Sequence, residues 1–168
     1  MVKVGIVMGS TSDKMVMDET CKLLSEFGIE YEVRILSAHR TPDEAISYAR
    51  GAYDRGLKVL IAGAGGAAHL AGVLAGVTTL PVIGVPMSTN LMGGLDSLLS
   101  IVQMPAGVPV ATVAVGKAGA KNAAVLALTI LGLSDESYHQ KLVEYKESMR
   151  QAVLANNEDG AVCTKEYL

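Results

Sequence analysis

One short stretch of the sequence, residues 37–43, concentrates side chains that could do chemistry. It reads Ser-Ala-His-Arg-Thr-Pro-Asp and places the imidazole of His39 and the guanidinium of Arg40 beside the hydroxyls of Ser37 and Thr41. Histidine is the side chain best suited to moving protons near neutral pH. Arginine forms paired hydrogen bonds to phosphate groups. These residue types predict proton transfer and phosphate recognition at one turn.

A second polar loop occupies residues 9–13, which read Gly-Ser-Thr-Ser-Asp. Its backbone N–H groups at a helix start, together with the hydroxyls of Ser10 and Ser12, could cradle a phosphate, and Asp13 favours the first turn of the helix. An ordinary capped turn between a strand and a helix explains the same spacing. The loop is not a Walker motif, because no GxxxxGK[ST] pattern is present.

A third loop, residues 63–68, reads Gly-Ala-Gly-Gly-Ala-Ala and loosely fits the dinucleotide pattern GxGxxG/A. That pattern also needs an acidic residue about 20 positions further on. The first acid downstream is Asp96, so we do not expect a nicotinamide cofactor. We expect Gly65, Gly66 and Ala67 instead to let the backbone approach a flat substrate closely.

The other candidate groups carry weaker signals. His69 follows the third loop, and His139 lies in the last helical pattern, where a structural role is the simpler interpretation. No metal-ligand spacing and no GxSxG nucleophile motif occurs. We therefore expect neither a metal nor a cofactor.

These loops must be positioned by the elements around them. Five apolar stretches, residues 3–8, 31–36, 59–62, 81–85 and 110–115, have the pattern of strands. The helical patterns between and after them cover residues 13–27, 42–56, an alanine-rich segment that holds His69, 95–104, 118–131 and 135–155.

Alternating strands and helices predict an α/β fold with a five-stranded parallel sheet and right-handed crossovers. We expect a flavodoxin-like three-layer αβα sandwich with strand order 2-1-3-4-5, followed by an amphipathic C-terminal helix. In such sheets ligands bind at the carboxyl ends of the strands. The three loops should therefore face one crevice.

Bulk properties narrow the function classes. A chain of 168 residues predicts one domain, residues 1–155, with a polar tail at 156–168. The net charge of -3 gives no reason to expect nucleic acid or an anionic membrane as partner. Cys21 and Cys163 lack metal or CxxC spacing, and the N-terminus lacks a signal-peptide pattern. A reduced, cytoplasmic protein is expected.

One region is unusually poor in charge. Between Lys58 and Lys117 the only ionised side chain is Asp96. A membrane span is disfavoured, because glycines and prolines interrupt every long apolar run. Strands buried on both faces and a subunit interface explain the composition better.

Five motifs together resemble the PurE family, over residues 3 to 155 and in the same order. They are Met-Gly-Ser-Thr-Ser-Asp at 8–13, the stretch at 37–43, Ala-Gly-Ala-Gly-Gly-Ala-Ala-His-Leu at 62–70, Leu-Pro-Val-Ile-Gly-Val-Pro at 80–86, and Asp-Ser-Leu-Leu-Ser-Ile-Val-Gln-Met-Pro at 96–105. The family comprises N5-carboxyaminoimidazole ribonucleotide mutases of purine biosynthesis.

The resemblance implies a homo-octamer in which neighbouring subunits finish each site. Ser10, Asp13 and Arg40 match the family's substrate-binding residues, and His39 matches its general acid/base. We expect Arg40 and the serines at the 5′-phosphate and Asp13 at the ribose hydroxyls.

The implied reaction moves a carboxyl group from an exocyclic nitrogen to C4 of an aminoimidazole ribonucleotide. The substrate loses CO2 while His39 donates a proton, the CO2 stays in the pocket, and C4 recaptures it before His39 removes the C4 proton. Such a reaction needs no metal, biotin or ATP. It needs a small dry pocket, which the loop at 63–68 could supply.

The sequence departs from the family pattern at Lys14, Ala71 and Ala106. Lys14 bears on substrate closure and Ala71 on local rigidity, and none of the three is a proposed catalytic group. A second branch of the family carboxylates aminoimidazole ribonucleotide directly with CO2. Its members have a sequence like Ser-Ala-His-Lys at the central turn and lack the Ala-Gly-Ala-Gly-Gly loop. Arg40 and residues 63–68 favour the mutase branch. The direct carboxylase and a non-catalytic nucleotide-binding module remain the alternatives.

Overall fold

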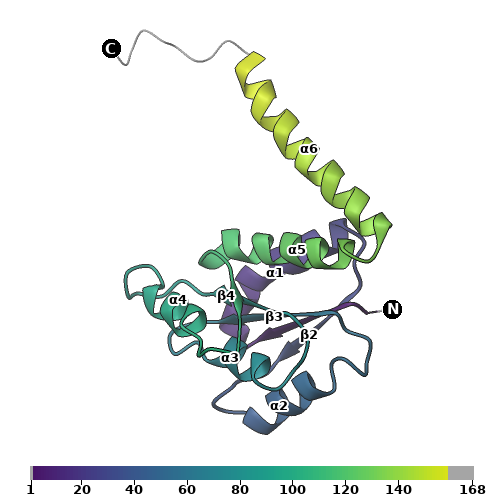
Figure 1. Cartoon of the computed structure of the whole chain (residues 1–168). Helices are drawn as coiled ribbons and strands as arrows, with labels where there is room; N and C mark the ends of the chain where they lie inside the picture. The colour runs from purple at the N-terminus through teal and green to yellow at the C-terminus, as the bar shows by residue number, and fades with distance from the viewer. Residues whose placement is uncertain (1, 159–168) are drawn as a thin grey trace.

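The protein, here a computed structural model that describes residues 2–158, has a five-stranded parallel sheet between two layers of helices (Figure 1). The strand order is β2-β1-β3-β4-β5, as predicted. In chain order the elements are β1 (Val4–Met8), the 3-10 helix η1 (Thr11–Asp13), α1 (Lys14–Glu26), β2 (Tyr31–Ile35), α2 (Pro42–Arg50), β3 (Val59–Ala64), α3 (Leu70–Ala75), β4 (Val82–Pro86), α4 (Leu95–Val102), β5 (Ala111–Thr112), α5 (Gly116–Gly132) and α6 (Glu136–Glu158).

The core lies on both faces of the sheet. Every residue of β1, β3 and β4 is buried, which is typical of parallel strands covered on each side. On one face Ile6 packs with Met17 of α1 and Leu128 of α5. On the other face Val7 belongs to a cluster that includes Leu74 of α3 and residues of α2 and α4. The sheet is therefore a rigid base for the loops at its carboxyl edge.

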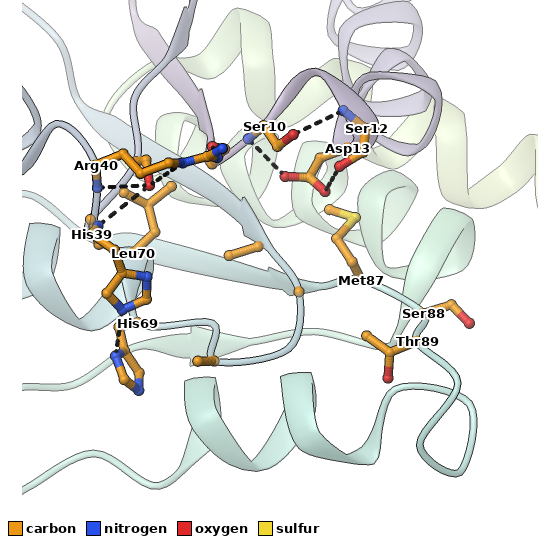
Figure 2. A pocket seen from close by; sticks show the side chains of 16 residues that line it. Ser10, Ser12, Asp13, His39, Arg40, His69, Leu70, Met87, Ser88 and Thr89 are labelled. Atoms are coloured by element: carbon orange, nitrogen blue, oxygen red, sulfur yellow. Dashed lines mark hydrogen bonds between the residues drawn. The ribbon is translucent and has the colours of Figure 1, made fainter.

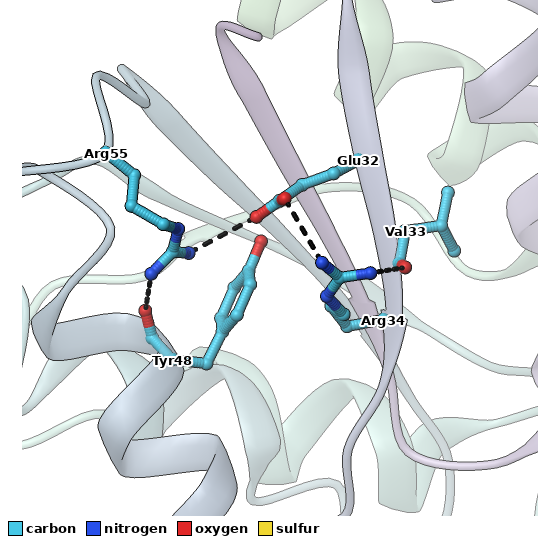
Figure 3. A network of polar contacts seen from close by, with 5 residues as sticks. All are labelled: Glu32, Val33, Arg34, Tyr48 and Arg55. Carbon is cyan, nitrogen blue, oxygen red and sulfur yellow. Dashed lines mark hydrogen bonds and ion pairs between the residues drawn. The ribbon is translucent and has the colours of Figure 1, made fainter.

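A polar network outside the core holds β2 against α2 (Figure 3). The Glu32 carboxylate pairs with Arg34 at 3.5 Å and with Arg55 at 3.2 Å. Arg55 also donates to the Tyr48 carbonyl and lies 4.6 Å over the Tyr48 ring. Burial, with Glu32 beside it, raises the pKa of the Tyr48 hydroxyl, which therefore stays protonated at neutral pH. The network fixes the two elements that flank the turn holding His39.

Several boundaries differ from the sequence prediction, and three of them bear on the site and the sheet edge. The second helix ends at Arg50, because the chain continues from Gly51 to Gly56 as turns rather than as helix. The expected strand at 110–115 pairs only over Ala111–Thr112, because it follows Pro109 at the edge of the sheet and has β4 as its single neighbour. His69 precedes α3 instead of lying inside it, since residues 66–69 form tight turns.

The last helix divides into a packed half and a projecting half. Leu142 is buried, and the rings of Phe27 and Tyr145 meet edge to face with their centroids 5.2 Å apart. Beyond this anchor α6 projects away from the sheet (Figure 1). Met149 and Val153 continue the apolar stripe of α6 that begins with Leu142 and Tyr145, and they are 45% and 64% exposed. This chain therefore buries only the first half of the stripe.

The last helix continues through Glu158, three residues into the predicted C-terminal tail. The rest of the tail lies outside the described residues. Within residues 2–158, no helix is both long enough and apolar enough to cross a membrane.

Candidate active site

A cavity of about 490 Å³ opens at the carboxyl edge of the sheet. Its walls come from the loops after β1, β2, β3 and β4, which is where a doubly wound fold is expected to bind ligands. The lining residues are Gly9, Ser10, Ser12, Asp13, Ser37, Ala38, His39, Arg40, Ala64, Gly65, Ala67, His69, Leu70, Met87, Ser88 and Thr89.

The loop after β1 is held by its own side chains (Figure 2). Ser10 caps η1: its hydroxyl accepts from the Ser12 N–H at 3.2 Å, and its N–H donates to the Asp13 carboxylate at 3.1 Å. The Ser12 hydroxyl also donates to Asp13, at 3.3 Å. The capped-turn interpretation is therefore correct, and the same residues line the cavity. The residues that cap η1 therefore also face the cavity.

Arg40 links the loop after β2 to the loop after β1. Its Nη2 donates to the Gly9 carbonyl at 2.8 Å and its Nε donates to the Ser37 hydroxyl at 3.3 Å. The Ser37 hydroxyl also accepts from the Arg40 backbone N–H, at 3.2 Å. These bonds hold an exposed guanidinium at the cavity rim, beside the Ser10 loop. The cation and the capped loop together form a surface suited to a phosphate group.

The His39 side chain contacts a second histidine. His39 Nε2 lies 2.9 Å from His69 Nδ1, and the two rings meet edge to face (Figure 2). One ring must donate and the other accept, so this bond requires a proton on one of the two facing nitrogens. Both residues are exposed, and both line the cavity. The pair can therefore pass a proton to or from a bound molecule.

The remaining wall is small and largely apolar. Gly65 and Ala67 line it together with Met87. Gly66, expected at the substrate, is not among the lining residues, because its N–H is bonded to Ser97 of α4 at 2.9 Å and its carbonyl accepts from Ala68 at 2.8 Å. Gly65 and Ala67 line the cavity, whereas Gly66 lies behind them and contacts α4.

The structure brings the other predicted site residues to one cavity. These are Ser10, Ser12, Asp13, Ser37, His39 and Arg40. Two contributions were missed from the sequence, His69 as the partner of His39 and the loop at 87–89. The signal for both was available, since each follows a strand whose carboxyl end meets the same edge of the sheet.

Asp13 makes the first testable prediction. Burial raises its pKa above the ordinary value of 3.8, against the lowering effects of Ser12, Ser10 and Arg40. The folded state therefore holds this proton more tightly than the unfolded chain, and ionising Asp13 costs stability as the pH rises through and above 3.8. We expect Asp13→Asn to gain thermal stability relative to the unmodified protein on going from about pH 4 to about pH 7.

Calorimetry at both pH values checks this prediction. Asp18→Asn, on the exposed surface of α1, is the control for a lost carboxylate outside the cavity. The prediction would be contradicted if the melting temperature of Asp13→Asn, relative to that of the unmodified protein, were lower at about pH 7 than at about pH 4.

No group of three or more histidine, cysteine or acidic side chains in the described part of the chain is arranged to hold a metal ion.

Comparison with known proteins bears out the resemblance to PurE. The family model described as AIR carboxylase matches residues 3–152. A Thermotoga maritima protein named N5-carboxyaminoimidazole ribonucleotide mutase is 55% identical over 169 residues, covering 100% of this chain and 98% of that protein. A Bacillus subtilis protein of the same name is 56% identical over 155 residues, 92% of this chain and 96% of that one. The crystal structure of Treponema denticola PurE superposes with a TM-score of 0.85 at 32% identity, over 95% of this chain and 98% of that one. This chain therefore belongs to the AIR carboxylase family.

Proposed function

We propose that this protein is an N5-carboxyaminoimidazole ribonucleotide mutase, an isomerase of purine biosynthesis that works in the cytoplasm. It converts the N5-carboxylated ribonucleotide into 4-carboxy-5-aminoimidazole ribonucleotide. The observation that carries the proposal is the placement of His39 in one cavity with a cation, a capped hydroxyl loop and a small apolar wall. The names of relatives more than half identical to this chain agree with it.

Substrate binding is assigned to the polar side of the cavity. The 5′-phosphate binds Arg40 with Ser10, Ser12 and Ser37, where donors and positive charge converge. The Asp13 carboxylate accepts from the ribose hydroxyls. The aminoimidazole ring then lies toward His39 and against Gly65 and Ala67, whose lack of bulk admits a flat ring.

The chemistry needs one proton to move twice. The N–CO2 bond breaks, His39 protonates the exocyclic nitrogen, and CO2 stays beside the ring. The electron-rich C4 then forms a C–C bond to CO2, and His39 takes the C4 proton, which restores the aromatic ring and the protonated imidazole. His69 supports both states, because its ring nitrogen can accept from or donate to His39. No metal or organic cofactor takes part in these steps.

Substrate choice separates the mutase from the direct carboxylase. We expect purified protein to form the C4-carboxylated product from the N5-carboxylated substrate without added bicarbonate. Turnover only of the uncarboxylated ribonucleotide, and only with bicarbonate, would establish the carboxylase instead. Binding without turnover of either would favour the non-catalytic module.

The site is proposed to be completed by other copies of the chain in a homo-octamer. In one chain His39, Arg40 and His69 are all exposed, and so are Gly65 and Ala67, yet a pocket that retains CO2 must exclude water. The charge-poor middle of the sequence supports contacts between copies. The exposed outer stripe of α6 supplies an apolar surface that one chain leaves uncovered.

Charges on that stripe should break the assembly. We expect the double variant Met149→Glu, Val153→Glu to give smaller particles than the unmodified protein by light scattering, because both side chains are exposed in one chain and would be buried in the oligomer. The matched control is Gln140→Glu with Gln151→Glu, which places the same two charges on the opposite, polar face of α6. Unchanged particle size for the stripe variant would exclude the stripe from the interface.

A further inference from the structure

Helix α4 contacts the cavity walls from behind. Asp96 and Ser97 belong to the first turn of α4, and neither residue lines the cavity. Ser97 is fully buried, and its hydroxyl accepts from the Gly66 N–H at 2.9 Å. Gly66 has a φ of 67°, in the left-handed region that favours glycine, so the loop after β3 turns sharply at the residue that Ser97 holds. The Ser100 hydroxyl, 3.2 Å from the Gly66 carbonyl, adds a second contact.

The same turn of α4 also holds the loop after β4. The Thr89 hydroxyl donates to Asp96 Oδ1 at 2.5 Å, and that oxygen also accepts from the Ser97 N–H at 2.9 Å. The start of α4 can lie this close to the loop after β4 because the residue before the helix is Gly94, which has a φ of 109° and no side chain. A Cβ at Gly94 would lie 2.7 Å from the Met87 carbonyl oxygen. Two separate loops are thus bonded to adjacent residues of one helix.

These two loops are the walls nearest the small apolar end of the cavity. Gly65 and Ala67 belong to the first loop, and Met87, Ser88 and Thr89 to the second. The sheet ladder joins them only as far as the Met87 N–H bond to the Ala64 carbonyl, at 2.9 Å, where the strands end. Asp96 and Ser97, which are neighbours in α4, set the relative position of the two loops through one hydrogen bond to each loop.

We propose that Asp96 and Ser97 are positioning residues for carboxyl transfer, which hold the two loops together so that CO2 stays beside the ring between the two steps. This inference rests on the proposed mutase function. CO2 carries no charge and offers only weak hydrogen-bond acceptors, so its retention depends on the shape of the walls rather than on a binding group. The phosphate-binding residues Arg40 and Ser10 lie on other loops and are not held by α4.

The test follows the fate of the carboxyl group. Substrate carboxylated at N5 is given to each variant, and both the C4-carboxylated product and the uncarboxylated ribonucleotide are measured, with spontaneous loss of CO2 subtracted from a reaction without enzyme. For Ser97→Ala we expect the ratio of uncarboxylated to carboxylated product to rise about tenfold, the effect of one hydrogen bond of ordinary strength, while KM changes less than about twofold.

The pair Thr89→Val and Thr89→Ser tests the second bond without emptying a buried position. Valine removes the hydroxyl that donates to Asp96 and should raise the same ratio, whereas serine keeps this donor and should give the ratio of the unmodified protein. Thr20→Val is the matched control for Ser97→Ala. Thr20 is also fully buried and its hydroxyl donates to the Ala120 carbonyl of another helix at 2.8 Å, but it lies away from the cavity. It should lower the melting temperature and leave the ratio unchanged.

The outcomes separate the two proposals. If the unmodified protein forms no C4-carboxylated product, the proposed function fails. If it does, and Ser97→Ala and Thr89→Val both keep the unmodified product ratio, the positioning role fails and the function stands. A ratio that rises equally in Thr20→Val would assign the effect to lost stability and would also overturn the positioning role. Should Ser97→Ala not fold, the Thr89 pair decides.

Discussion

Replacing His39 by asparagine is expected to remove turnover while leaving substrate binding intact. Asparagine keeps a polar side chain of similar reach but cannot donate and then recover a proton at neutral pH. General acid/base groups contribute about a hundredfold to ten-thousandfold to a rate, so kcat should fall by that amount. The dissociation constant for the product should change little, because the phosphate and ribose contacts are proposed to come from other residues of the cavity lining.

Steady-state kinetics and calorimetric titration of the product measure these two effects. His139→Asn is the control, because it makes the same change in a helix that does not line the cavity. Substantial residual activity in His39→Asn, after exclusion of contaminating enzyme, would contradict the role assigned to His39.

Replacing Arg40 by methionine is expected to weaken substrate binding by about a hundredfold, because hydrogen bonds to charged groups are stronger than neutral ones and a guanidinium makes two to a phosphate. Arg40→Lys should recover part of the loss. Lysine keeps the positive charge but lacks the planar guanidinium, whose nitrogens bond to Gly9 and Ser37 while the group faces the cavity.

The effect should appear in KM and in product affinity more than in kcat, since the phosphate is remote from the reacting carbon. Arg34→Met serves as the control, because Arg34 is an exposed arginine of β2 that does not line the cavity. Equal product affinity in Arg40→Met and Arg34→Met would show that the phosphate binds elsewhere.

Much of this site was predictable because it depends on sheet topology. The alternation of strands and helices predicted the order β2-β1-β3-β4-β5, and that order alone places Ser10, His39 and Gly65 at one edge. Family motifs then predicted roles for those residues. The topology was equally informative about the loop after β4, but Ser88 and Thr89 carry no motif that distinguishes them from other polar loop residues.

The contacts between distant residues were not predictable from local patterns. His39 and His69 are 30 positions apart, and Gly66 and Ser97 are 31 apart. Both pairs form only when two loops are brought together by the sheet. For the same reason the sequence suggested Gly66 as a substrate contact, although its N–H is already used by α4.

The extent of the last strand and the last helix depended on neighbours that the sequence does not reveal. The apolar residues at 110–115 suggested a strand, but only Ala111–Thr112 pair with β4 at the edge of the sheet. The stripe on α6 suggested a packed amphipathic helix, yet Met149 and Val153 extend beyond the surface that this chain offers. An amphipathic pattern predicts that a face will be buried, not whether the same chain buries it.

The central claim is that the carboxyl group moves from nitrogen to C4 without leaving the cavity. It is tested most directly by turning over substrate whose N5-carboxyl carbon is isotopically labelled, in a large excess of unlabelled bicarbonate, and measuring the label in the C4-carboxylated product by mass spectrometry. We expect nearly all product molecules to retain the label, because recapture from the cavity precedes exchange with the solution. Product that has lost the label would show that the carboxyl carbon comes from the bicarbonate in solution and would contradict the mutase account.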